Sequence, residues 1–397
     1  MLRELAEFDE FGAKSLVQSK DHGEFVVPTF TNEFWTAKQR AANNLHEVSY
    51  RACFKPQLPR FFIDRLTTPG DLVMDPFMGR GTTLVESALA GRRAAGADIN
   101  PLSGILTAPR LNPPTQASVK ERLLKIDFTK GGDEPEDLLT FYHPDTLREI
   151  SALRRHLLEP PGADAADAWI RMVATNRLTG HSPGFFSVYT LPPNQAVTVA
   201  RQKLINAKRN QTPPYRNVQA ILEKKSKSLL RDITADDRQR LRSLADRHQI
   251  VVSSADDLSE IRANSVALVV TSPPFLDIVQ YSTDNWLRCW FNGIDAEQIR
   301  IWKFGNVLRW QEAMARVFVE LKRVLRPGGH VAFEVGEVRK GKIQLEDHVV
   351  PAATSAGLEP VLVLINAQEF TKTSNCWGVD NQSKGTNTNR IILLRKP

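Results

Sequence analysis

The chain has 397 residues, 42% apolar and 24% charged, with a formal net charge of +7, ordinary values for a globular protein of one or two domains. No apolar run is long enough to cross a membrane and the first residues lack a leader pattern, so we expect no membrane contact and no secretory signal. The three cysteines lie far apart without a CxxC pair, which argues against disulfides or zinc and favours a reducing cytoplasmic location.

The first regular elements are predicted between residues 55 and 101. Residues 55–66 predict a helix, and residues 70–77 are a short apolar run between turn residues, typical of a buried parallel strand. Residues 79–91 give a glycine turn, a helix and a glycine stop. The stretch 92–101 predicts a second strand, which ends at Asp98. This strand–helix–strand unit has the length of one crossover.

A mostly helical segment with proline-rich joints follows, and we interpret residues 111–248 as an insertion. Residues 199–250 contain 13 Lys and Arg against 5 Asp and Glu, whereas the rest of the chain is nearly neutral. Such a basic segment suits a polyanion, with nucleic acid the first candidate. A solvated helical surface explains it about as well, because Lys and Arg are good helix formers.

The alternation of strands and helices returns after the insertion. Strands are predicted at 249–258 and 265–275, a helix at 311–329, a strand at 330–336, a helix at 345–357, and strands at 359–366 and 389–397. About seven strands alternating with helices predict an α/β fold with a doubly wound, mostly parallel sheet. Residues 1–110 and 249–397 would form one catalytic domain interrupted by 111–248. Ligands bind outside the carboxyl ends of such strands.

The stretch "DPFMGRGTT" (75–83) lies where a predicted strand leads into a helix. Gly79 and Gly81 permit a tight turn and close approach of a ligand. Asp98 could accept hydrogen bonds from both hydroxyls of a ribose. A GxG is weak evidence alone: Leu84 stands where a GxGxxG would have its third glycine, and a tight turn with a solvated Asp98 is the structural alternative. The acidic surroundings disfavour a pyrophosphate. A cationic nucleoside such as S-adenosylmethionine suits Asp75 better.

The stretch "VVTSPPF" (269–275) ends another predicted strand at two prolines. Prolines fix the backbone and donate no hydrogen bond, so nearby carbonyls are rigidly aimed. Together with the Ser272 hydroxyl and the Phe275 ring, these carbonyls predict a pocket for a planar group with an exocyclic amine. Acceptors for its hydrogens would localise the nitrogen lone pair for attack on a methyl sulfonium. A base in a duplex would first have to flip out. A strand terminator with a rim aromatic is the alternative.

Together, the two stretches resemble the motifs of DNA amino-methyltransferases, which methylate exocyclic nitrogens. The Ser-Pro-Pro form is similar to N4-cytosine enzymes, whereas adenine enzymes more often carry Asp-Pro-Pro or Asn-Pro-Pro. This resemblance implies a Rossmann-like methyltransferase sheet, S-adenosylmethionine as cofactor, double-stranded DNA as substrate and, where one exists, a restriction endonuclease acting separately. Methylation of cytosine carbon 5 is set aside. That family uses a cysteine nucleophile that follows a proline, and no cysteine here follows a proline.

The resemblance also implies roles for individual residues. The helix near 54–66 would pack around the methionine part, Asp98 would hold the ribose, and Asp256, with Asp257 close behind, would contact the adenine amine. The implied cofactor residues are Phe54, Pro56, Asp75, Pro76, Phe77, Gly79, Gly81, Thr82, Thr83, Asp98, Ile99, Asp256 and Asp257. The implied catalytic residues are Ser272, Pro273, Pro274 and Phe275.

The sequence departs from this family's pattern in ways that concern the target. Many Ser-Pro-Pro enzymes carry the catalytic motif before the cofactor motif, and here the order is reversed. The inserted segment holds the side-chain types that contact phosphates and base edges, and we expect DNA contacts from it. The candidates are Asn194, Gln195, Arg201, Lys203, Lys208 and Arg209. Adenine N6 methylation, RNA guanine N2 methylation and a non-catalytic nucleic-acid-binding module remain alternatives.

Overall fold

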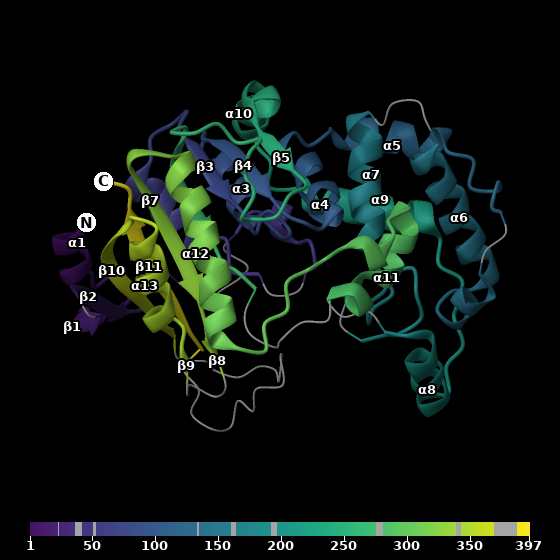
Figure 1. Ribbon diagram of the computed structural model, residues 1–397. Helices are drawn as coiled ribbons and strands as arrows, with labels where there is room; N and C mark the ends of the chain where they lie inside the picture. The colour runs from purple at the N-terminus through teal and green to yellow at the C-terminus, as the bar shows by residue number, and fades with distance from the viewer. Residues whose placement is uncertain are drawn as a thin grey trace.

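The computed structural model describes the chain apart from residues 23, 36–41, 51–52, 133–134, 160–163, 192–196, 275–280, 339–342 and 369–386. A large twisted sheet with helices on both faces forms one side of the molecule, and a group of helices lies beside it (Figure 1). In the described residues no helix is long and apolar enough to cross a membrane.

The sheet has nine strands in the order β1-β2-β10-β11-β7-β6-β3-β4-β5. These are β1 (Leu16–His22), β2 (Phe25–Asn32), β3 (Leu72–Asp75), β4 (Arg93–Ala97), β5 (Gln249–Val251), β6 (Val266–Thr271), β7 (Leu325–Val335), β10 (Glu359–Gln368) and β11 (Asn387–Arg395). A separate small pair consists of β8 (Glu337–Val338) and β9 (Ile343–Gln344).

The strands from β5 to β7 are all parallel, and β11 is antiparallel between β7 and β10. The chain leaves β3 toward β4 and β5, then returns to add β6 and β7 on the other side of β3. The order therefore reverses between β3 and β6, where open α/β sheets bind ligands. This confirms the predicted doubly wound α/β fold.

The structure has two sheet strands more than the sequence predicted. Strands β1 and β2 form an antiparallel hairpin, and β2 pairs in parallel with β10 near the other end of the chain. Predicted boundaries also differ, most of all at β5 and β7. Strand β5 has only three residues, and β7 begins at Leu325, ahead of the Pro-Gly-Gly turn (327–329) at the end of the helix predicted over 311–329. Leu325 pairs with Val266 of β6, which draws that turn into the strand.

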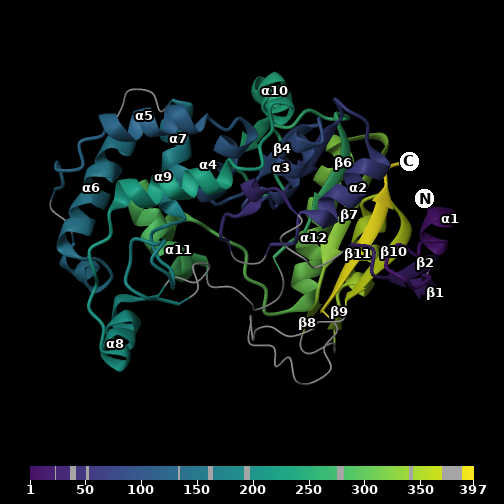
Figure 2. The same ribbon diagram turned by 180° about the vertical axis from the view of Figure 1, so that it is seen from behind.

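Helices cover both faces of the sheet. Helices α12 (Val307–Val324) and α13 (Glu346–Ser355) cover one face of the sheet. They bury apolar side chains of its strands there, such as Val269 and Phe333. On the other face lies α2 (Gln57–Leu66), next to α3 (Thr82–Leu89), as Figure 2 shows from behind. There Phe62 of α2 belongs to the same apolar cluster as Val73 and Val270. The central strands β3 and β6 are therefore buried on both faces, as expected of near-continuous apolar runs.

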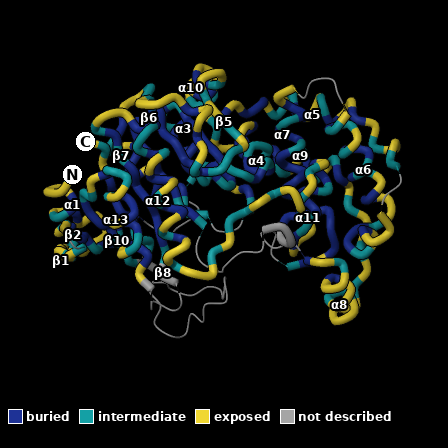
Figure 3. Tube along the Cα trace, viewed as in Figure 1, coloured by how far each residue is buried: buried dark blue, intermediate teal, exposed yellow. Residues whose placement is uncertain are grey.

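The chain between β4 and β5 is mainly helical. Its helices are α4 (Pro101–Leu111), α5 (Gln116–Lys125), α6 (Pro144–Leu158), α7 (Ala165–Thr175), α8 (Val199–Arg209), α9 (Val218–Leu229) and α10 (Ala235–Leu244). They share a core around Trp169, whose indole nitrogen donates to Ser226 at 3.0 Å. Helix α8 stands away from that core and is largely exposed (Figure 3). It projects in the direction toward which the carboxyl end of β7 points (Figures 1 and 2).

Candidate active site at the carboxyl ends of β3 and β6

The first predicted motif forms the turn from β3 into α3. Gly79 and Gly81 have φ of 49° and 72°, and Gly81 is the residue before the first helical turn. That left-handed conformation strains residues with a Cβ, which explains the glycines. Thr82 and Thr83 begin the helix and are buried.

Asp75 is the last residue of β3 and is almost completely buried. Its carboxylate accepts hydrogen bonds from the Thr271 hydroxyl at 2.6 Å and from the backbone N–H of Phe77 at 3.0 Å. Burial raises the pKa of Asp75 to about 7. In the described residues no lysine, arginine or histidine forms an ion pair with it. Within the part of the chain that the structure describes, the site therefore contains a buried acid without a counter-charge.

Asp98 follows β4, and both its oxygens are engaged. Oδ2 accepts from the backbone N–H of Gly79 at 2.9 Å, and Oδ1 accepts from that of Asn100 at 2.8 Å. This ties the end of β4 to the glycine turn after β3. Burial raises the pKa of Asp98. Ile99 is half-buried beside it. Each carboxylate oxygen can accept a second hydrogen bond, so Asp98 keeps capacity for a ligand.

Asp256 and Asp257 lie in the loop after β5. Asp256 accepts from the Ser254 hydroxyl at 2.5 Å and pairs with Arg316 of α12 at 3.1 Å. Asp257 is exposed. Phe77 stands on the same side of the sheet, where its ring contacts Trp302 at a centroid distance of 6.1 Å. The two acids thus lie toward the α12 face, with Asp256 already engaged in an ion pair.

The residues before α2 complete the surroundings of the turn. Phe54 packs at the edge of the core below α2, and Pro56 caps that helix. Tyr50, which the sequence did not single out, lies on the glycine turn: a Cβ built on Gly79 would stand 3.3 Å from its ring. The Tyr50 hydroxyl also accepts from the Asn100 side chain at 3.3 Å.

The second predicted motif follows β6 directly. The Ser272 hydroxyl donates to the carboxylate of Glu334, a buried residue near the end of β7. The carbonyl of Pro274 accepts a hydrogen bond of 2.9 Å from the indole N–H of buried Trp310. Pro273 is buried. Phe275 lies outside the described residues.

Glu334 and Trp310 are site residues that the sequence analysis missed. Glu334 also accepts from the side chain of Asn389 at 2.8 Å, and burial raises its pKa. A signal did exist in the sequence: Glu334 is a lone acid in the apolar strand "HVAFEV", and a buried acid needs partners. Which partners it has follows only from the sheet order.

Of the predicted DNA contacts, four lie on α8 and are exposed, namely Arg201, Lys203, Lys208 and Arg209. The guanidinium of Arg209 stands over the Tyr189 ring at 3.8 Å, and Lys203 pairs weakly with Asp137 at 3.7 Å. Asn194 and Gln195 lie outside the described residues.

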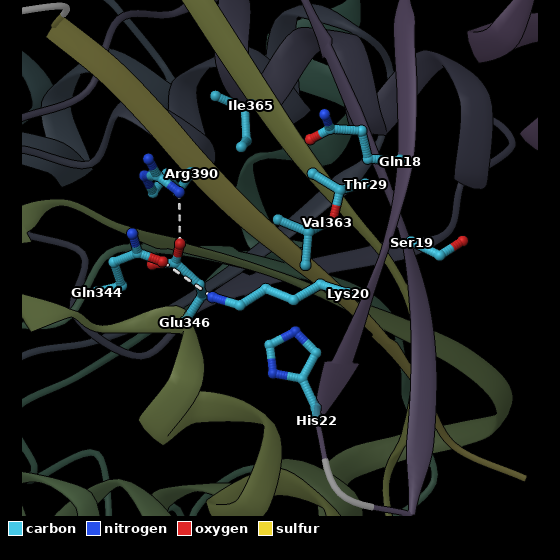
Figure 4. A pocket seen from close by; sticks show the side chains of 10 residues that line it. All are labelled: Gln18, Ser19, Lys20, His22, Thr29, Gln344, Glu346, Val363, Ile365 and Arg390. Atoms are coloured by element: carbon cyan, nitrogen blue, oxygen red, sulfur yellow. Dashed lines mark hydrogen bonds and ion pairs between the residues drawn. The ribbon is translucent and has the colours of Figure 1, made fainter.

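A hollow of about 630 Å³ lies elsewhere, at the β1–β2 end of the sheet (Figure 4). Arg390 pairs with Glu346 there, and Lys20 donates to Gln344 at 2.9 Å. His22 also lines it, with Nε2 buried and unbonded among the described residues. None of the predicted site residues contributes to the lining of this hollow. It is therefore separate from the site at β3 and β6.

Comparison with known sequences agrees with this geometry. A sequence family described as DNA methylase, covering N6 and N4 enzymes, matches residues 17–102, from β1 to the start of α4. This range contains the glycine turn and Asp98. Residues 17–102 are therefore similar to the DNA amino-methyltransferase family.

Curated relatives of the family agree. The type II methyltransferase M.MjaII of Methanocaldococcus jannaschii is 36% identical over 106 residues, which is 25% of this chain and 20% of that protein. M.BsoBI of Geobacillus stearothermophilus is 22% identical over 68% of this chain and 57% of its own length. M.MvaI of Kocuria varians is 28% identical over 31% and 25%. The chain thus spans between a fifth and three fifths of these relatives.

The solved structures that match this chain include methyltransferases at low similarity. A putative DNA modification methylase from Thermus thermophilus, crystallised with S-adenosylmethionine, is 23% identical over 36% of this chain and 53% of its own, with a TM-score of 0.22. The rRNA methyltransferase AviRa of Streptomyces viridochromogenes is 13% identical over 92% and 94%, with a TM-score of 0.39. Scores this low say nothing about the substrate.

Proposed function

We propose that this protein transfers a methyl group from S-adenosylmethionine to the N4 amine of a flipped-out cytosine in double-stranded DNA. One observation carries the proposal. The glycine turn after β3 and the Ser-Pro-Pro turn after β6 adjoin where the strand order reverses, joined by the hydrogen bond of 2.6 Å between Thr271 and Asp75. A cofactor and a base bound at the two turns would meet at this junction.

The chemistry of the first turn fits S-adenosylmethionine. Asp75 and Asp98 present two acids, and the described residues near them supply no ion-pairing cation. A pyrophosphate would be repelled there, whereas a ribose and a positively charged group are suited. Asp98 would hold the ribose, and Gly79 and Gly81 would let the ligand approach the backbone. When bound, the cofactor supplies a methyl group on a positively charged sulfur.

The second turn is built to receive an amine. Because the Ser272 hydroxyl gives its hydrogen to Glu334, its oxygen lone pairs remain available to accept an N–H of the target. Trp310 fixes the Pro274 carbonyl and with it the path of the turn. An amine held by such acceptors would have its lone pair localised on the nitrogen, out of the plane of the base, where it could attack the methyl group. Stacking by Phe275 stays a prediction.

Serine before the two prolines favours cytosine N4 over adenine N6. The matched family covers both reactions, so N6 methylation is the second candidate. The deciding experiment incubates the protein with methyl-labelled S-adenosylmethionine and mixed genomic DNA, with total RNA in parallel, and identifies labelled nucleosides by mass spectrometry. Ser272→Ala is the matched variant.

Label in N4-methylcytosine that the variant loses is the expected result. Label in N6-methyladenine would retain the mechanism and replace the base. Label in RNA alone would replace the substrate, and label in neither, despite cofactor binding, would leave only a binding module.

DNA contact by α8 is tested by charge removal. Lys208→Ala with Arg209→Ala removes two exposed cations from the end of α8, and Lys120→Ala with Lys125→Ala removes two from α5 as a matched control. If both α8 cations contact phosphates, the slope of log affinity against log salt should fall by about 2 in the first variant only. Equal slopes for both variants would exclude α8 from the interface.

A further inference from the structure

The carboxyl group of Asp75 is the feature that the proposed function does not fully use. It lies almost completely buried at the junction of the two turns, hydrogen-bonded to Thr271 but without a cation among the described residues. A buried ionised acid normally has a charged partner. The described residues supply none at ion-pair distance, so a ligand is the natural source of one.

The surroundings of this carboxyl accommodate both of its protonation states. The ionised form accepts from Thr271 and from the backbone N–H of Phe77. Thr83 gives its own hydroxyl hydrogen to the Val270 carbonyl at 2.9 Å, so its oxygen can accept a hydrogen bond from the protonated acid. Neither state leaves the carboxyl without a hydrogen-bond partner. The free-energy gap between the two protonation states is small enough for a positive charge on a ligand to determine which state is populated.

Resting on the proposed function, we propose that Asp75 is the counter-charge of the sulfonium and thereby distinguishes S-adenosylmethionine from its product. S-adenosylhomocysteine has the same adenosine and amino acid parts but a neutral thioether. Only the charged cofactor would hold Asp75 in its ionised form. The product would lose this attraction and bind more weakly relative to the cofactor.

The proposal makes affinity depend on pH in a way specific to the ligand. Burial raises the pKa of Asp75 to about 7, so the acid is mainly protonated in the free protein below that pH. A cation must then displace the proton, and its affinity falls as the pH falls. Affinity for S-adenosylmethionine should drop about tenfold from pH 8 to pH 6, and that for S-adenosylhomocysteine by less than about twofold.

Other titratable groups face the same carboxyl. Asp98 of the turn after β4 repels the ionised form, and Cys53 approaches from the segment before α2 with its pKa raised by burial. Both ligands share the ribose that Asp98 would hold. Titration of Asp98 therefore affects both affinities, and it cancels in their ratio.

The experiment is isothermal titration of the full chain with each ligand from pH 5.5 to 8.5, in buffers of different ionisation enthalpy. At pH 6 we expect S-adenosylmethionine binding to release close to one proton and S-adenosylhomocysteine binding to release few. Asp75→Asn should make the affinity ratio independent of pH. Asp71→Asn, at the opposite end of β3 and paired with Arg326 at 2.7 Å, is the control and should retain the wild-type profile.

The outcomes separate this inference from the proposed function. Equal pH dependence for both ligands would mean that Asp75 faces the amino group they share, and would overturn the inference while retaining the cofactor. Absence of binding by either ligand would overturn the proposed function itself. Should Asp75→Asn not fold, Thr271→Val serves instead. It removes a donor to the ionised acid, so the pH midpoint for S-adenosylmethionine must move upward, and an unmoved midpoint would refute the inference.

Discussion

Gly81 offers the sharpest test of the glycine turn, because the backbone and its surroundings both oppose a side chain there. Its φ is 72°, and an added Cβ would stand 2.9 Å from the Cβ of Thr107 on α4 and closer still to the rest of that side chain. The left-handed conformation costs a residue with a Cβ about 1–2 kcal/mol. Overpacking adds about 1–3 kcal/mol. Gly81→Ala should therefore lower the free energy of unfolding by about 2–5 kcal/mol.

Gly70→Ala isolates the conformational part, because Gly70 has φ of 89° and an added Cβ there meets nothing within 4 Å. The Thr107 hydroxyl is buried and unbonded among the described residues, so Thr107→Ala alone should cost little. In the Gly81→Ala background the same change should recover about 1 kcal/mol or more, a coupling that a double-mutant cycle measures. Urea unfolding followed by circular dichroism gives all four values. Equal losses for Gly81→Ala and Gly70→Ala, or no recovery, would refute the reasoning.

Three further predictions concern the second turn and a helix end. Trp310→Phe keeps an aromatic side chain but loses the indole N–H that bonds to the Pro274 carbonyl. At about 1–1.5 kcal/mol this loss should slow single-turnover methylation roughly tenfold with cofactor affinity unchanged, and a normal rate would contradict this. Burial raises the pKa of Glu334, so if its ionised form orients Ser272 the rate should rise with pH through that raised pKa, and Glu334→Gln should abolish the rise in a pH–rate profile. Thr234→Ala breaks the capping box of α10 and should cost about 1 kcal/mol in thermal unfolding, leaving methylation intact.

The sequence predicted the elements whose signals are local. The apolar run at 266–271 and the glycine turn after β3 specify a buried strand and a strand–helix junction without reference to distant residues. Strands β1 and β2 escaped prediction because β1 is an edge strand with mostly exposed side chains. The pairing of β2 is with β10, more than 300 residues further along the chain. Such a strand is defined by its partner more than by its own pattern.

The candidate site divides in the same way. Asp75, Asp98 and Ser272 were identified because each stands at the end of a predicted strand, and parallel strands bring such ends together. Glu334 also stands near a strand end, but its importance depends on β7 lying next to β6, which no local pattern states. Trp310 reads as one apolar position of an amphipathic helix. Only the fold shows that its indole nitrogen reaches Pro274.

The position of β11 has a consequence for the order of assembly. It is the last strand in chain order, yet it lies inside the sheet, between β7 and β10. Until it is in place, both neighbours present unpaired edges, and β10 and β2 are separated from the rest of the sheet. Strand β11 also supplies Asn389, which bonds to Glu334 behind Ser272. During synthesis the support of the Ser-Pro-Pro turn is therefore completed only after residue 389 has emerged.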